Sequence, residues 1–454
     1  MQEIIGKNFK QQLWLTLSFS APLIGSNLAQ ASKQLTDAAM LGHYGVDELA
    51  AGVLAGTIFL ITFVVGSGFA MAAIPLASEA RGAGLTWKLR RIIRMSFWLS
   101  TTYWLLLFMP LHHIETVLLL LGQEPTIARL AGEYMAIAVW GIFPAMTVMV
   151  LKSFFVALGK PKIIFWATLL GALINVPANY MFIFGNWGAP ELGIAGAAYA
   201  TIFAHGLTLS VMLLYLLIDG DCRTYSLFAR LWKPEWKILG SVFQLGWPVS
   251  VTLTSEIGLF AAGSVMAGWV GTISLAAHGI VLETAAFVFM IYLGFANAAT
   301  AQAGFAVGAR SRAALGRVTR AVLTLTGLTV VVVVIIFISI PELLVRAFLD
   351  TESEGASEVL RIGITLVFMG AAFQLADAFQ VVALGLLRGL SDTRMPMIIA
   401  AISYSLVGLP VSYVAGFVIG WGAVGIWCGF IAGLAIAAVW LLFRFRRKLR
   451  SLDF

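Results

Sequence analysis

Residues 395–443 contain no charged side chain over 49 consecutive positions, and most of these residues are apolar. A membrane-spanning helix needs about 20 such residues, so this stretch is long enough for two spans with a turn near residues 420–422. Because lipid offers no water to backbone amides, only helices and closed barrels cross a bilayer. A barrel would show alternating segments of about ten residues. The unbroken run therefore predicts an all-α integral membrane protein.

Ten further apolar stretches lie along the 454-residue chain, and two of them hold one acid each. They cover residues 11–32, 49–78, 95–114, 134–151, 163–190, 192–218, 240–268, 284–309, 321–341 and 359–387. Only 11% of all residues are charged, whereas soluble proteins carry about 25%. The composition thus excludes a soluble fold, and the stretches predict twelve transmembrane helices.

The basic residues gather in alternate loops. The loops and tails on one side of the predicted membrane hold 25 of the 29 Lys and Arg residues, and the opposite loops are acidic. Basic loops lie on the cytoplasmic side of bacterial membranes, so both termini are predicted to be cytoplasmic. The formal charge of +7 is then a topology signal, and we expect no nucleic-acid partner.

The chain repeats itself at an offset of 226 residues. Pro22 pairs with Pro248, and Gly68-Phe69-Ala70 pairs with Gly294-Phe295-Ala296. Two copies of a six-helix unit insert with the same topology, and a substrate cavity is expected where they meet. The sequence predicts two pseudo-symmetric lobes, an N-lobe at 1–218 and a C-lobe at 238–454, joined by a charged cytoplasmic linker at 219–237.

Four acids lie inside predicted spans: Asp37, Glu256, Glu283 and Asp377. A charge inside a bilayer is costly, so such residues usually face a protein interior or a water-filled cavity and often mark an ion pathway. The alternative is an acid near a helix end that is solvated or salt-bridged. That alternative applies most to Glu283, near the outer start of its helix.

The role of the other polar residues in the spans has more than one interpretation. Lys33 precedes Asp37 by four residues, so it either forms an intrahelical ion pair or competes with a coupling ion for that carboxylate. Asn175 and Asn179 flank Pro177, so they line a cation site or bond neighbouring helices. Gln374 is more often such a polar link between helices than a ligand.

Motifs for phosphate binding and for metal chemistry are missing from the sequence. Gly159-Lys160 is followed by Pro161 rather than by Ser or Thr, and there is neither an H-E-x-x-H motif nor a Cys/His cluster. We therefore expect no enzyme, no catalytic residues and no cofactor. A secondary transporter remains the leading interpretation.

Several motifs resemble those of the NorM group of multidrug and toxic compound extrusion (MATE) transporters. They are Thr36-Asp37, Glu256, Asp377 with Gln380-Val381-Val382 and Leu387-Arg388-Gly389, Asn175-Val176-Pro177-Ala178-Asn179, and Gly188-Ala189-Pro190-Glu191-Leu192-Gly193. The resemblance covers nearly the whole chain. It implies two six-helix lobes, a location in the bacterial cytoplasmic membrane, a monomer, and export of cationic amphiphilic drugs and dyes in exchange for Na⁺ or H⁺.

The resemblance also implies two ion sites. Asp37 with Asn175 and Asn179 would form the N-lobe site, and Glu256 with Asp377 would form the C-lobe site; either set could hold Na⁺. Members of the group place a tyrosine where this chain has Phe373, and they lack a lysine at the position of Lys33.

A flippase for lipids or lipid-linked precursors is the alternative function, since relatives of this fold perform it. A flippase for anionic headgroups would need a cationic cavity, whereas the predicted spans hold four acids and one lysine. The drug exporter is therefore the preferred prediction.

Overall fold

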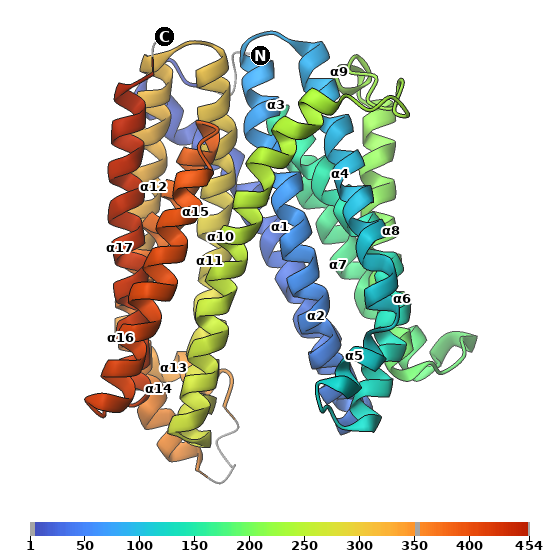
Figure 1. The fold of residues 1–454 in the computed structure, drawn as a ribbon, viewed down its shortest axis with the longest axis vertical. Coiled ribbons are helices and arrows are strands. Elements are labelled where there is room, and N and C mark those ends of the chain that lie inside the picture. The colour runs from blue at the N-terminus through green and yellow to red at the C-terminus, as the bar shows by residue number, and fades with distance from the viewer. Residues whose placement is uncertain (1–4, 350–354, 453–454) are drawn as a thin grey trace. The chain divides into compact units, whose positions relative to one another are not determined.

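The computed structural model describes residues 5–349 and 355–452, except for the side chain of residue 46. Within these ranges, eleven helices are long and apolar enough to cross a membrane. Helix α1 (Phe9–Tyr44) has 36 residues but is richer in Gln, Ser and Thr than these eleven. The predicted all-α membrane fold is confirmed, and Figure 1 shows its long helices.

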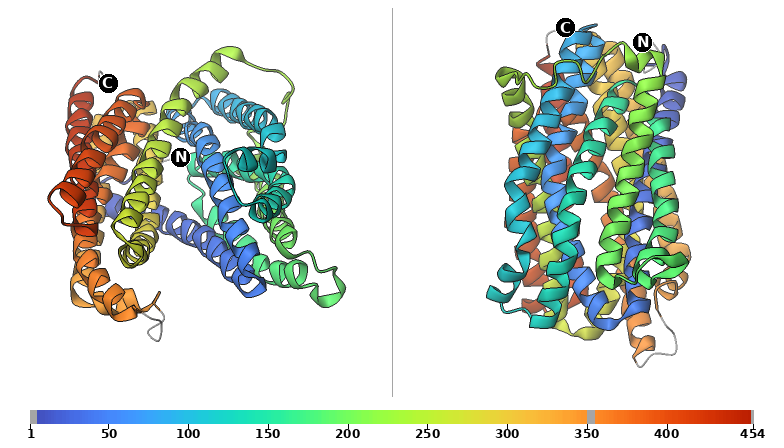
Figure 2. Two further views of the ribbon diagram at one scale, coloured as in Figure 1. Left: turned by 60° about the horizontal axis from the view of Figure 1, so that its bottom comes forward. Right: turned by 90° about the vertical axis from the view of Figure 1, so that its right-hand side faces the viewer.

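The chain divides into two compact units, Gly25–Ser250 (the N-unit) and Met1–Ile24 with Val251–Phe454 (the C-unit). In the N-unit, α6 packs against α2, α4 and α8, and α8 also packs against α7. Figure 2 shows these helices from the side, running along a common direction. After α1, the helices that begin in this unit are α2 (Val46–Met71), α3 (Ala73–Gly82), α4 (Thr86–His112), α5 (Ile114–Leu120), α6 (Pro125–Ala157), α7 (Pro161–Phe184), η2 (Asn186–Gly188), α8 (Gly193–Ile218), α9 (Gly220–Arg223) and α10 (Trp236–Val270).

The C-unit repeats this packing, because α14 packs against α11, α12 and α17. The turn predicted near 420–422 separates the last two spans, and Gly420 and Gly422 adopt the positive φ values of 85° and 55° that favour glycine. The remaining helices are α11 (Thr272–Gly308), α12 (Arg312–Ser339), α13 (Pro341–Arg346), α14 (Ala356–Gly389), α15 (Arg394–Ala401), the π-helix η3 (Ile402–Gly408), α16 (Leu409–Tyr413), the π-helix η4 (Val414–Val418) and α17 (Ala423–Arg450).

The boundaries between the units lie inside helices α1 and α10, whereas the predicted lobes were divided at the linker 219–237. One boundary follows Ile24 and the other follows Ser250, so they are 226 residues apart, the offset of the sequence repeat. Each boundary lies two residues beyond one of the paired prolines. The first part of each of these two helices therefore belongs to the opposite unit from the rest of that helix.

Close contacts between helices explain why the boundaries between the units lie inside α1 and α10. A Cβ added at Gly68 in α2 would lie 2.6 Å from the backbone nitrogen of Ser250, and one at Gly294 in α11 would lie 3.0 Å from that of Ile24. These glycines and their neighbours are repeat-equivalent pairs. The start of α1 is also tied to α11 within the C-unit, since Gln302 accepts hydrogen bonds from Thr16 and Gln12 at 2.9 and 3.2 Å.

Candidate functional site

Asp37 lies on α1 within the N-unit, where α7 and α8 supply its hydrogen-bond donors. The amide of Asn179 donates to Oδ1 of Asp37 at 2.6 Å, and the hydroxyl of Thr201 donates to Oδ2 at 3.2 Å. Asn179 also donates to Oδ1 of Asn175 at 3.3 Å, and both asparagines are fully buried. The structure thus brings together the three residues of the predicted N-lobe set. Thr201 was not anticipated, because 164 residues separate it from Asp37.

Lys33 does not form the direct ion pair that its spacing from Asp37 suggested. Within the described part of the chain, no Asp37 oxygen lies within 4.0 Å of the Lys33 ammonium nitrogen. Nζ of Lys33 instead lies 3.1 Å from Nε2 of His205 on α8. The Asp37 carboxylate accepts hydrogen bonds from Asn179 and Thr201, whereas the Lys33 ammonium contacts the His205 imidazole.

Glu256 on α10 and Asp377 on α14 are both buried in the C-unit, with 5% and 1% of their surfaces exposed. They lie close enough to interact electrostatically. Among the residues described, Oε1 of Glu256 and Oδ1 of Asp377 have no hydrogen-bond partner. An unpaired carboxylate in such a place is costly, so each acid favours a bound proton or a cation.

Phe373, one turn before Asp377, packs its ring against aromatic side chains. Its centroid lies 5.9 Å from that of Phe260 and 5.5 Å from that of Trp427. Gln374 beside it is fully buried, and neither polar atom of its amide has a hydrogen-bond partner in the described chain. The phenylalanine is therefore part of an aromatic cluster, and the glutamine does not link two helices.

Two tyrosines near the C-unit acids were missed in the sequence. Tyr292 on α11 is fully buried near Asp377, and its hydroxyl has no partner among the described atoms. Tyr404 in η3 accepts a hydrogen bond from Gln380 and lies within electrostatic range of both acids. Phenol oxygens therefore reach this region from α11 and η3, although Phe373 supplies none. No spacing rule marks such residues, since both lie in unremarkable apolar runs.

Glu283, the fourth predicted intramembrane acid, is placed differently from the other three. Its side chain is exposed on α11 rather than buried with Glu256 and Asp377. The structure does not bring it into either group, and a role in ion binding remains only a prediction.

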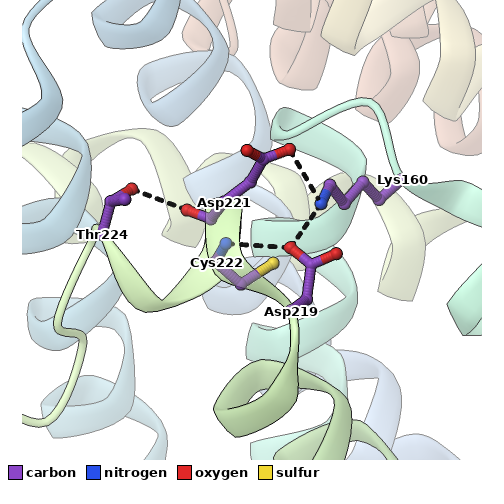
Figure 3. Close-up of polar contacts among 5 residues, drawn as sticks. All are labelled: Lys160, Asp219, Asp221, Cys222 and Thr224. Carbon is purple, nitrogen blue, oxygen red and sulfur yellow. Dashed lines mark hydrogen bonds and ion pairs between the residues drawn. The ribbon is translucent and has the colours of Figure 1, made fainter.

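A polar cluster at one end of the N-unit lies outside the spans and joins two loops. Nζ of Lys160 lies 2.5 Å from Asp219 and 3.2 Å from Asp221, and Asp219 also accepts a hydrogen bond of 3.0 Å from the backbone of Cys222 (Figure 3). Burial alone would raise the pKa of Asp219, but the hydrogen bonds from Lys160 and Cys222 outweigh it and hold the pKa below its usual range. The ion pair of Lys160 with Asp219 therefore connects the start of α7 to the end of α8.

Known proteins resemble this chain in both of its repeated halves. The model of the family described as MatE matches the chain twice, at residues 22–181 and 248–414. A protein from Rhizobium meliloti (strain 1021), named "Probable multidrug resistance protein NorM", is 41% identical, with 98% of this chain and 95% of that protein covered. A protein of the same name from Agrobacterium fabrum (strain C58 / ATCC 33970) is 39% identical, with 95% and 92% covered.

Solved structures share the fold at lower identity. The crystal structure of MATE in the straight conformation has a TM-score of 0.88 at 20% identity and covers 99% of both chains. A eukaryotic MATE transporter, AtDTX14, has a TM-score of 0.83 at 21% identity, with 98% of this chain and 99% of that chain covered. These structures establish the helical architecture of both units.

Proposed function

Because the chain belongs to the MatE family, whose similar members are named as multidrug resistance proteins, we propose that it is a secondary antiporter that exports cationic amphiphilic drugs in exchange for H⁺ or Na⁺. The family consists of transporters, so the protein is a multi-pass multidrug transporter and not an enzyme. The exchange, the coupling ion and the charge of the substrate are the parts of this proposal that need testing.

The observation that carries the proposal is the pair of buried acids in the C-unit. Glu256 and Asp377 each keep an oxygen without a hydrogen-bond partner in the part of the chain described. Two nearby carboxylates titrate as a unit, and either one gains from a proton, a metal cation or a cationic drug. Competition of these species for the same negative charge is the simplest chemistry for cation antiport.

Both candidate ions have chemical support in this region. A proton needs only one of the two carboxyl groups, whereas Na⁺ needs several oxygen ligands to replace its hydration shell. Beside the two acids, oxygens of Tyr292 and Gln374 lack partners among the described residues. The ring of Phe373 adds apolar surroundings near Asp377. We expect that protons suffice to drive transport, and that any Na⁺ effect adds to the proton-driven rate.

The test is ethidium transport in everted membrane vesicles with an imposed pH gradient and rigorously Na⁺-free buffer. Ethidium uptake that follows the pH gradient would support proton antiport. If ethidium uptake occurs only after Na⁺ is added, whatever the pH gradient, proton coupling is contradicted, but the result still supports an antiporter. Uptake that ignores both gradients would contradict the proposed exchange itself.

The proposal includes a location and an orientation. We propose a monomer in the bacterial cytoplasmic membrane, and the basic loops support an orientation with both termini in the cytoplasm. The start of α1 and the end of α17 lie at the same end of the C-unit (Figure 1), as an even number of spans requires. Labelling of single cysteines introduced next to Lys10 and Arg450 by a membrane-impermeant reagent in intact cells tests this: both should stay unlabelled.

A further inference from the structure

The first turns of α4 in the N-unit carry three arginines next to the linker that leads to α10. Arg90 and Arg91 of α4, together with Arg230 of the linker, lie within electrostatic range of Arg94. Glu235 of the linker belongs to the same group and pairs with Arg91 at 3.0 Å. These four arginines, here called the arginine cluster, are thus accompanied by one carboxylate. Like charges at such distances repel one another, so the cluster favours a further anion.

The linker is fixed along α4 by hydrogen bonds from side chains to its backbone. Arg94 donates to the carbonyl oxygens of Arg230 and Lys233. One turn further along α4, Nε1 of Trp98 donates to the carbonyl oxygen of Leu231 at 2.8 Å. Because backbone atoms accept these bonds, the linker is held against α4 over several residues. The arginine cluster is therefore arranged by the fold itself, before any ligand binds.

Donors of the arginine cluster remain unused. Arg94 is 3% exposed, and its Nε has no hydrogen-bond partner among the described residues. Arg90, one turn before it, is half-buried, and its Nε likewise lacks a partner in the described ranges. A buried donor without an acceptor costs free energy, and phosphate oxygens suit the planar guanidinium group especially well. The unused donors and the excess positive charge both point to a phosphate-like anion.

The arginine cluster lies at the predicted boundary between membrane and water. The apolar stretch of α4 begins at residue 95, directly after Arg94, and that of α10 begins at residue 240. The same two segments carry Trp87, Trp232 and Trp236, which are 48%, 71% and 72% exposed. Exposed tryptophans at span ends lie at the level of the lipid headgroups. The anion that reaches this place most readily is therefore a lipid headgroup.

We propose that the arginine cluster binds the phosphodiester headgroup of an anionic phospholipid of the cytoplasmic leaflet, such as phosphatidylglycerol. The guanidinium groups supply charge and N–H donors to the phosphate oxygens, and the exposed tryptophans contact the glycerol region of the lipid. The site uses the membrane orientation proposed above but goes beyond the antiport. Its binding is measurable without transport, so its failure would leave the proposed exchange untouched.

The sequence repeat supplies a matched control in the C-unit. At the offset of 226, Arg94 corresponds to Arg320 of α12, which also directly precedes a predicted apolar stretch but is exposed. Arg90 corresponds to Gly316, and the tryptophan at position 87 corresponds to Ala313. Arg320 is thus a basic residue at an equivalent place without the rest of the cluster.

The test uses the purified, delipidated full-length protein in a neutral detergent. Its thermal unfolding midpoint is measured during titration with phosphatidylglycerol at constant ionic strength. Phosphatidylcholine is the control for acyl chains, and inorganic phosphate is the control for a free anion. A saturable rise with phosphatidylglycerol that neither control reproduces is expected.

Variants connect the response to the arginine cluster. Arg90→Gln removes one charge and leaves the hydrogen bonds between α4 and the linker in place. It should weaken phosphatidylglycerol binding about 10- to 100-fold, the factor that one charge-assisted hydrogen bond represents. Arg94→Gln should weaken binding at least as much, because it also releases the linker. Arg320→Gln should bind phosphatidylglycerol like the unmodified protein.

Three results would overturn the proposal. One is an unfolding midpoint that rises equally with phosphatidylglycerol and phosphatidylcholine, which would mean that the headgroup is not recognised. Another is an equal rise with inorganic phosphate, which would indicate a site for a soluble anion. The third is an unchanged affinity for phosphatidylglycerol in Arg90→Gln, whether or not Arg94→Gln folds.

Discussion

Replacing Asp37 by asparagine separates the charge of this residue from its hydrogen bonds. The carboxylate accepts from Asn179 at 2.6 Å and from Thr201 at 3.2 Å. An asparagine keeps one oxygen for the Asn179 amide, and its own amide donates to the hydroxyl of Thr201. Both contacts persist in Asp37→Asn, but neither is any longer charge-assisted.

The stability cost of Asp37→Asn follows from these two contacts. A hydrogen bond to a charged group contributes about 1.5–3 kcal/mol and a neutral one about 0.5–1.5 kcal/mol, so each contact loses about 1 kcal/mol and the total is about 2 kcal/mol. Easier burial of the neutral amide offsets part of this. For a domain of this size the unfolding midpoint should fall by no more than about 8 °C.

Transport should respond far more strongly than stability. Asp37→Asn should abolish ion-coupled ethidium efflux at normal expression, because the N-unit then lacks its negative charge. Thr201→Val is the control: it removes one of the two hydrogen bonds but keeps the carboxylate, so efflux should be reduced yet remain ion-dependent. Normal coupled efflux by a well-expressed Asp37→Asn protein would refute the reasoning.

Three further predictions address other parts of the molecule. Asp377→Asn should abolish coupled export while the protein remains in the membrane; normal ethidium efflux at normal expression would contradict this. Gly429→Val should destabilise the C-unit by about 1–3 kcal/mol, since a Cβ there would lie 2.0 Å from Oγ of Ser412; an unchanged unfolding midpoint would show that α17 moves freely away. Lys160→Met should lower the unfolding midpoint most near neutral pH. The depressed pKa of Asp219 means that its contribution is present above the unfolded-state pKa of about 4 and is lost as the pH falls through the lower folded-state value. A difference from the unmodified protein that stays constant from pH 7 to pH 3 would contradict this assignment.

The helices and their repeat could be predicted because they rest on local patterns. Apolar length and the loop charges locate spans, and α2 and α11 begin at residues 46 and 272, which are 226 apart. The repeated glycines Gly68 and Gly294 now have a physical reason, since each lets a neighbouring helix approach closely. A sequence repeat identifies such a glycine, but it does not predict which helix packs against it.

The partners of the polar residues were harder to predict, because they come from distant helices. Lys33 and Asp37 are one turn apart, so an ion pair was the natural local interpretation. The competing contact with His205 is 172 residues away, and only the packing of α1 against α8 decides between the two. Tyr292 approaches Asp377 for the same kind of reason.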